Sequence, residues 1–103
     1  IASRFAAVGM SKAMAQEFGP YNIRCNAVCP GLVRTPTQDT ALVELAESEG
    51  VDRSDIVDAQ HAKIPLGRSG EPAEIATLVA YLCSPSGAYI SGAAIPVDGG
   101  MGL

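Results

Sequence analysis

Only two short segments of the sequence have the composition of β-strands, and this limits most strongly what the chain can fold into. Residues 23–28 and 93–97 are short, mostly apolar runs, and each is followed by a turn that contains glycine. Helical patterns precede and separate them, and strands that alternate with helices favour a parallel sheet with helices on its faces. Because a two-stranded sheet is at best marginally stable, we expect this chain to be the C-terminal part of a larger α/β domain whose other strands come from elsewhere.

The helical patterns differ in strength along the chain. The first is rich in alanine, the best helix former, and Gly19 and Pro20 end it. The third pattern, over residues 52–62, has Asp52 as its expected N-cap. The last carries apolar residues at i, i+3, i+4 and i+7 from Ile75, so one face is expected to pack on the sheet. The four predicted helices span residues 3–18, 39–48, 52–62 and 72–83.

The charge balance argues against nucleic-acid and membrane partners. The chain has 7 basic and 11 acidic residues, a net charge of −4, and the acids concentrate in residues 39–58. Nucleic-acid affinity depends on clustered Lys and Arg, and no run of about 18 apolar residues is present. The cysteines are Cys25, Cys29 and Cys83. Cys25 and Cys29 would lie on one face of a strand, roughly 13 Å apart, too far for a disulfide, so we expect reduced thiols in a cytoplasmic protein.

No self-contained catalytic motif is present. The sequence has no G-x-S-x-G, H-E-x-x-H, Cys-x-x-Cys or P-loop pattern. His61 is the only histidine and the only side chain that ordinarily titrates near neutrality. Its place at the end of a polar helix favours a surface or partly buried position over a role as general base. Asn26 is expected to be structural, with its amide tying neighbouring loops together.

Several blocks of sequence occur in a recognisable order. They are Ile1–Val8, Ile23–Pro36, Pro65–Arg68, Glu71–Ala76 and Ile90–Gly100. Together they resemble the C-terminal blocks of the short-chain dehydrogenase/reductase family, and only roughly residues 37–62 lack a match. The resemblance implies a Rossmann-type doubly wound parallel sheet. It also implies that residues 1–103 are the C-terminal portion of a single dinucleotide-binding oxidoreductase domain, with 37–62 as its variable substrate-side flap.

The resemblance further implies hydride transfer between NAD or NADP and a carbonyl or secondary alcohol. In this family a Tyr-x-x-x-Lys pair moves the proton at the substrate oxygen. The tyrosine would immediately precede Ile1, and Arg4 stands at the lysine position. Arg4 keeps the positive charge and has donors for ribose hydroxyls, although its planar fork is wider than an ammonium group. An ordinary solvated arginine is the alternative. Without the tyrosine and a glycine-rich phosphate turn, the isolated chain is expected to be inactive.

The turn after residues 23–28 carries the predicted cofactor contacts. Pro30 and Gly31 turn the chain at the carboxyl edge of the sheet, where open α/β sheets bind ligands. Glycine leaves room for a cofactor there, and the backbone of Val33 can face a carboxamide. The resemblance implies that the Val33 backbone and the Thr35 hydroxyl hold the nicotinamide amide. The cofactor-binding residues are therefore predicted to be Arg4, Pro30, Gly31, Val33 and Thr35. A simple strand-to-loop turn is the alternative.

Partners are also implied by the resemblance. The helix over 3–18 corresponds to one that pairs across a two-fold axis, which predicts a homotetramer or dimer, although packing within one subunit explains its small residues nearly as well. A small-molecule substrate and a complementing N-terminal segment are expected. The alternative function is a non-catalytic nucleotide-binding or scaffold relative, which Arg4 favours. A self-contained interaction module is a third hypothesis.

Overall fold

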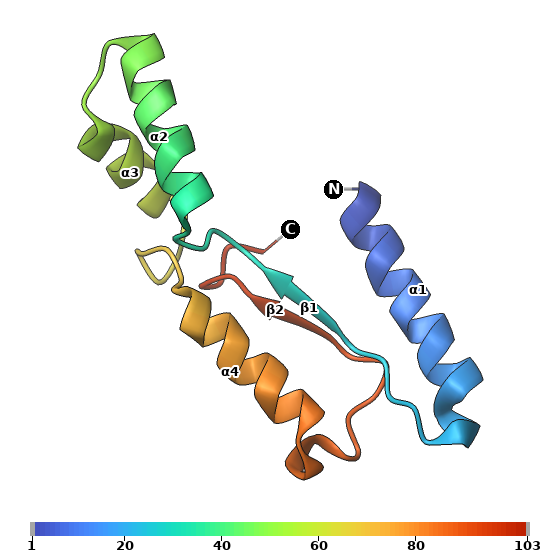
Figure 1. The fold of residues 1–103 in the computed structure, drawn as a ribbon. Coiled ribbons are helices and arrows are strands. Elements are labelled where there is room, and N and C mark those ends of the chain that lie inside the picture. The colour runs from blue at the N-terminus through green and yellow to red at the C-terminus, as the bar shows by residue number, and fades with distance from the viewer. Residues whose placement is uncertain (1, 103) are drawn as a thin grey trace.

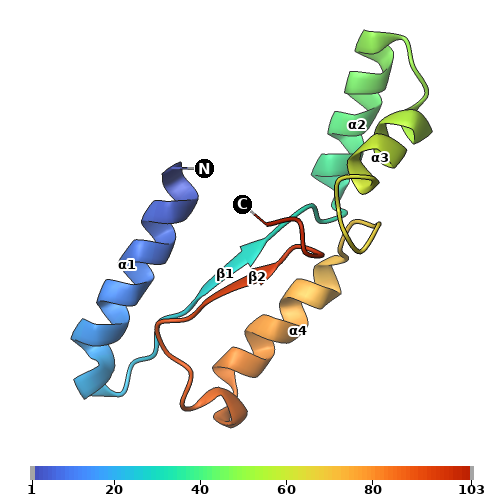
Figure 2. The same ribbon diagram turned by 180° about the vertical axis from the view of Figure 1, so that it is seen from behind.

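The computed structural model describes residues 2–102, so Ile1 and Leu103, the two ends of the predicted domain, lie outside the described residues. Two parallel strands lie side by side, with α1 on one side and α4 on the other (Figure 1). The α2–α3 hairpin projects beyond the carboxyl ends of the strands, and the view from behind shows the same arrangement (Figure 2). The elements are α1 (Ala2–Phe18), η1 (Gly19–Tyr21), β1 (Ala27–Pro30), α2 (Pro36–Glu49), α3 (Arg53–His61), α4 (Pro72–Cys83), η2 (Pro85–Gly87) and β2 (Ala94–Val97).

The parallel pairing of β1 with β2 confirms the predicted α/β class. The register pairs Ala27 with Ala94 and Pro30 with Val97. The long connection between the strands contains three helices, as parallel strands require a crossover rather than a hairpin.

The predicted strand over 23–28 was misplaced, because β1 starts only at Ala27 and continues through Pro30. Asn26 directly precedes β1, and its side chain bonds to the loop before β2. Its Nδ2 donates to the Ile90 carbonyl and its Oδ1 accepts from Ala93 N–H, both at 3.0 Å. This side-chain bridge replaces the regular ladder, which confirms the structural role predicted for Asn26. Cys25 therefore precedes the strand, so Cys25 and Cys29 do not lie on one face of a single strand as predicted.

Pro30 lies inside β1, although proline was expected to stop the strand. The ladder runs from Ala27 N–H to the Ala93 carbonyl (2.8 Å) and ends with Gly31 N–H to the Val97 carbonyl (3.0 Å). Parallel strands alternate the direction of successive peptide groups, so Val28 and Pro30 face away from β2. The nitrogen of Pro30 is thus at an edge where proline is tolerated.

The helix boundaries follow the local capping signals. α1 and α4 lie where the sequence predicted them, and α3 is within a residue of its predicted ends. α2 begins at Pro36, three residues earlier than predicted. The cause is Thr35, whose Oγ1 accepts a hydrogen bond from Gln38 N–H (3.2 Å) and caps the helix. The helix ends at Gly50, which has a φ of +66°.

The core is thin in the described part of the chain. Its buried apolar residues are Cys29, Leu42, Ala46, Ile64 and Leu82. The predicted core stripe of α4 is only partly covered, because Leu82 is buried while Val79 is exposed. α1 contributes no buried residue, and Phe5 and Met10 are 62% and 63% exposed. None of the helices within residues 2–102 combines the length and apolar character that a membrane crossing requires.

Candidate functional site

The predicted site residues gather at the carboxyl edge of the sheet. Both strands run towards the α2–α3 hairpin, and the start of α1 lies at that same end (Figure 1). β1 leads into residues 31–35, and β2 leads into residues 98–100. The order of strands and helices therefore places the two loops and the first turn of α1 around one end of the sheet.

Val33 lies in an extended segment beyond β1 that pairs with Gly70. Arg34 N–H donates to the Gly70 carbonyl and Gly70 N–H donates to the Leu32 carbonyl, each at 2.9 Å. Because this pattern alternates, the N–H and carbonyl of Val33 face away from Gly70, and within residues 2–102 neither group has a backbone partner. The N–H and the carbonyl of Val33 thus offer one donor and one acceptor at the sheet edge.

Thr35 uses its hydroxyl oxygen to cap α2, but this leaves the hydroxyl proton available. The oxygen accepts from Gln38 N–H, and a hydroxyl has one donor and two acceptor sites. Thr35 can therefore cap the helix and donate to a ligand at the same time. The capping role was not predicted, although threonine followed by proline is a usual helix start.

Close packing against Asp98 requires a glycine at position 31, a constraint that is not visible in the sequence. A Cβ added at this position would lie 2.6 Å from the Asp98 Cβ and 2.8 Å from the Asp98 Cα. The absent side chain therefore lets the end of β1 approach the end of β2. The sequence predicts that this glycine leaves room for a ligand, but Asp98 occupies the space into which a Cβ would point.

Arg4 lies in the first turn of α1 and is exposed. It lines a mostly apolar cleft of about 230 Å³ between α1 and the two strands. Among residues 2–102 its guanidinium makes no ion pair. The other residues that line the cleft are Phe5, Val8, Cys29, Ala94, Pro96, Asp98 and Gly102. Arg4 therefore lines the same cleft as Cys29, the residue in β1 that precedes Pro30.

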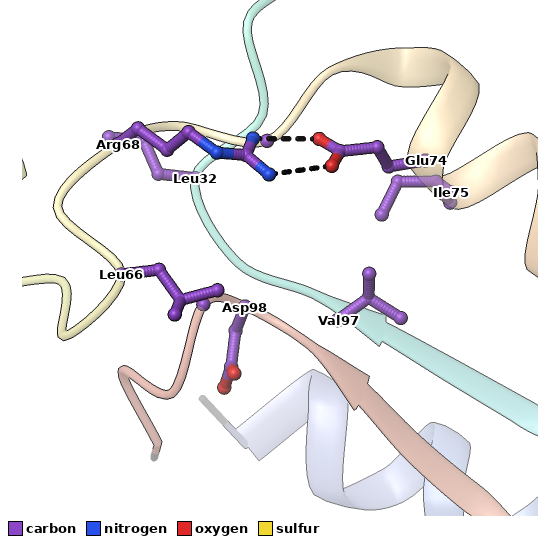
Figure 3. Close-up of a pocket in the computed structure, with 9 residues that line it drawn as sticks. Leu32, Leu66, Arg68, Glu74, Ile75, Val97 and Asp98 are labelled. Carbon is purple, nitrogen blue, oxygen red and sulfur yellow. Dashed lines mark hydrogen bonds and ion pairs between the residues drawn. The ribbon is translucent and has the colours of Figure 1, made fainter.

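A second, smaller cavity of about 100 Å³ lies between the two loops and the start of α4 (Figure 3). Two hydrogen bonds of 2.9 and 2.7 Å join the Arg68 guanidinium to the Glu74 carboxylate on its wall. Glu74 also accepts from Glu71 N–H at 2.8 Å. Arg68 first, and this backbone N–H second, lower the pKa of Glu74 to about 2. Asp98 points its carboxylate away from this pair, and it accepts from the backbone N–H groups of the glycine turn that follows it.

The Arg68–Glu74 pair is not among the functional residues that the sequence predicts. The spacing of Glu71 and Glu74 around Pro72 signals the bond from Glu71 N–H to Glu74, because a glutamate three residues after an N-cap commonly bonds back to that residue's N–H. Bidentate pairing with arginine is not visible in the spacing, since the loop that carries Arg68 is irregular.

Comparison with known proteins adds independent findings. The family model described as "Enoyl-(Acyl carrier protein) reductase" matches residues 1–102. A putative ketoacyl reductase of the monensin polyketide synthase from Streptomyces virginiae is 41% identical over 101 residues, which are 98% of this chain and 39% of that protein. The chain spans about two fifths of the length of the curated relatives it matches.

Solved structures share the fold. A short-chain dehydrogenase family protein from Francisella tularensis has a TM-score of 0.89 at 34% identity, covering 93% of this chain and 40% of that one. The L-sorbose reductase of Gluconobacter frateurii, solved in complex with NADPH and L-sorbose, has a TM-score of 0.86 at 35% identity. That match covers 93% of this chain and 37% of the reductase.

Proposed function

Because the chain belongs to the short-chain dehydrogenase/reductase family, we propose that it forms the C-terminal portion of an oxidoreductase domain that binds NAD or NADP. The reaction would be hydride transfer to or from a carbonyl or secondary alcohol. The nicotinamide supplies the hydride chemistry when bound, and the residues of this chain bind and orient it. The NADPH complex of the similar L-sorbose reductase supports this choice of cofactor.

The observation that carries the proposal is the open peptide group of Val33 beside Thr35. A nicotinamide carboxamide has one amino donor and one carbonyl acceptor, so it complements the Val33 carbonyl and N–H. The Thr35 hydroxyl still has a proton to donate beside them. The residues present therefore fit the group. Pro30 and Gly31 would aim this segment, since they fix the end of β1 against Asp98.

Arg4 would supply the fixed positive charge of the site. Its guanidinium has donors for the ribose hydroxyls and would favour the ionised form of a tyrosine placed one turn earlier. The cleft that it lines is mostly apolar.

The remaining strands of the sheet would pair along the outer edge of β1, where only its last residue, Pro30, lacks an N–H. The outer edge of β1 offers the N–H and carbonyl of Val28. A complementing N-terminal segment at this edge would also bring the tyrosine and the glycine-rich phosphate turn.

The hairpin of α2 and α3 would form the substrate-side flap over residues 37–62. It follows the proposed nicotinamide contacts directly and packs chiefly on itself through Leu42 and Ala46. Such an element can close over a bound small molecule and exclude water.

We propose that the complete protein is cytoplasmic and forms a homotetramer or dimer. Free cysteines favour a reducing compartment. The exposed apolar side chains of α1, including Phe5 and Met10, favour a partner for that helix.

Arg4 also supports one alternative, a non-catalytic relative that kept nucleotide binding and lost the reaction. Arginine is not a conservative replacement where an ammonium group fits tightly. The two functions differ in one respect. The oxidoreductase turns over a carbonyl substrate, whereas the non-catalytic relative binds NADH or NADPH without turnover.

Nucleotide titration of the complete protein tests the proposal. Thr35→Val should weaken NADPH or NADH binding by about three- to tenfold, the value of one hydrogen bond, while Thr35→Ser should not. Thr40→Val, in the next turn of the same helix, is the matched control and should leave affinity unchanged. Arg4→Ala should reduce nucleotide affinity and turnover together. If wild-type protein binds neither nucleotide, or if Thr35→Val and Arg4→Ala bind as wild type, the assignment is wrong.

A further inference from the structure

The flap is attached to the rest of the chain by few side chains. Within residues 2–102, a single side-chain hydrogen bond reaches from α2 or α3 to the chain beyond residue 66. It joins His61 Nε2, in the last residue of α3, to Ser69 Oγ at 3.0 Å. Two other side-chain hydrogen bonds of these helices, from Arg53 to Asp39 and from Thr40 to the Pro36 carbonyl, stay inside the hairpin.

Ser69 connects this bond to the proposed nicotinamide segment. The next residue, Gly70, pairs with the backbone on both sides of Val33. At the other end of the flap, Thr35 caps α2. Both helices of the flap are therefore hydrogen-bonded towards residues 32–35. α2 is capped by Thr35, and α3 bonds through His61 to Ser69, the neighbour of Gly70.

The bond lies at the wall of an open cavity that is lined by both polar and apolar side chains. His61 and Ser69 line a cavity of about 320 Å³ together with Arg34, Gln60 and Glu71. A neutral imidazole nitrogen can donate or accept, and a protonated one donates, so the bond to a hydroxyl can form in either protonation state.

We infer that His61 is a positioning residue whose hydrogen bond to Ser69 holds the flap against the nicotinamide-binding segment. The inference rests on the proposed function, because it gives that segment its ligand. His61 acts through Ser69 and Gly70 and does not touch the reacting atoms. Binding of nucleotide at Val33 and Thr35 then also orders α3.

Hydrogen–deuterium exchange of the complete protein tests the inference. Without nucleotide, His61→Ala and Ser69→Ala should each speed exchange of the α3 amides by about three- to tenfold, and the double variant should add nothing further. Gln60→Ala, in the same turn and lining the same cavity, should exchange as wild type. His61→Gln should restore slow exchange, because its amide reaches about as far as Nε2.

Nucleotide then separates the two hypotheses. With NADPH or NADH, wild-type protein should gain protection at residues 32–36 and in α3, whereas His61→Ala should gain it at residues 32–36 alone. No protection at residues 32–36 in wild type contradicts the proposed function. Protection there, with α3 responding alike in wild type, His61→Ala and Ser69→Ala, overturns the role of His61. So does an effect of Gln60→Ala equal to that of His61→Ala. Ser69→Ala removes only an oxygen and provides the test if His61→Ala does not fold.

Discussion

Gly31, directly after β1, lies close to Asp98, directly after β2, and replacing it with alanine tests the arrangement of the sheet edge. The new methyl carbon would lie 2.6 Å from the Asp98 Cβ and 2.8 Å from its Cα, whereas ordinary contact begins at 3.4 Å. The end of β1 must therefore move by about 0.8 Å, since the Asp98 backbone gives no flexible group that can yield.

The expected loss of stability follows from three contributions. Overpacking of a close contact costs about 1–3 kcal/mol. The displacement weakens the 3.0 Å bond from Gly31 N–H to the Val97 carbonyl, worth about 1 kcal/mol. Alanine restricts the unfolded chain and returns about 0.4–1 kcal/mol. The net destabilisation is about 1–3.5 kcal/mol, or a decrease in Tm of about 2–14 °C for a domain of roughly 150–250 residues.

Thermal and urea unfolding of the complete protein measure this change, with Gly70→Ala as the matched control. Gly70 lies on the neighbouring segment, and a Cβ there would meet its nearest atoms at 3.8–3.9 Å, which is ordinary contact. Gly70→Ala should therefore leave stability unchanged or raise it by up to about 1 kcal/mol, because only the restriction of the unfolded chain acts there. Equal Tm values for Gly31→Ala and Gly70→Ala would refute the close approach of Gly31 to Asp98.

Two further predictions concern polar contacts. Arg68 holds the pKa of Glu74 at about 2, below the ordinary 4.5, so the pair stabilises the fold fully above about pH 4.5 and loses that contribution as the pH falls towards 2. Glu74→Gln should flatten the dependence of Tm on pH in this range, and a slope equal to wild type would contradict the pairing. Asn26→Ala should lower stability by about 1–3 kcal/mol in urea unfolding, because it removes both bonds that join Asn26 to Ile90 and Ala93. Asn26→Asp keeps the acceptor alone and should fall between wild type and Asn26→Ala.

The sequence predicted the elements whose signals are local. Gly19 and Pro20 end α1, and Pro72 begins α4 where predicted. These residues act through their own backbone restrictions, which need no partner elsewhere in the chain. The same holds for the turn at Pro30 and Gly31, although its first residue proved to belong to the strand.

The strand boundary could not be predicted in this way. β1 begins at Ala27 because the Asn26 side chain bonds to the loop at Ile90 and Ala93. Alternation of apolar residues carries no information about such a bridge. The early start of α2 depends instead on whether the Thr35 oxygen turns towards Gln38 N–H, a conformational choice that the residue type permits but does not impose.

The sequence by itself determined the residue types and their order at the candidate site, and with them the family. Tertiary structure decided which groups those residues present. The peptide of Val33 is open because Gly70, distant in sequence, pairs with Leu32 and Arg34 on the opposite side. A strand residue's hydrogen bonds are made to another part of the chain, so their direction follows from register and not from local preference.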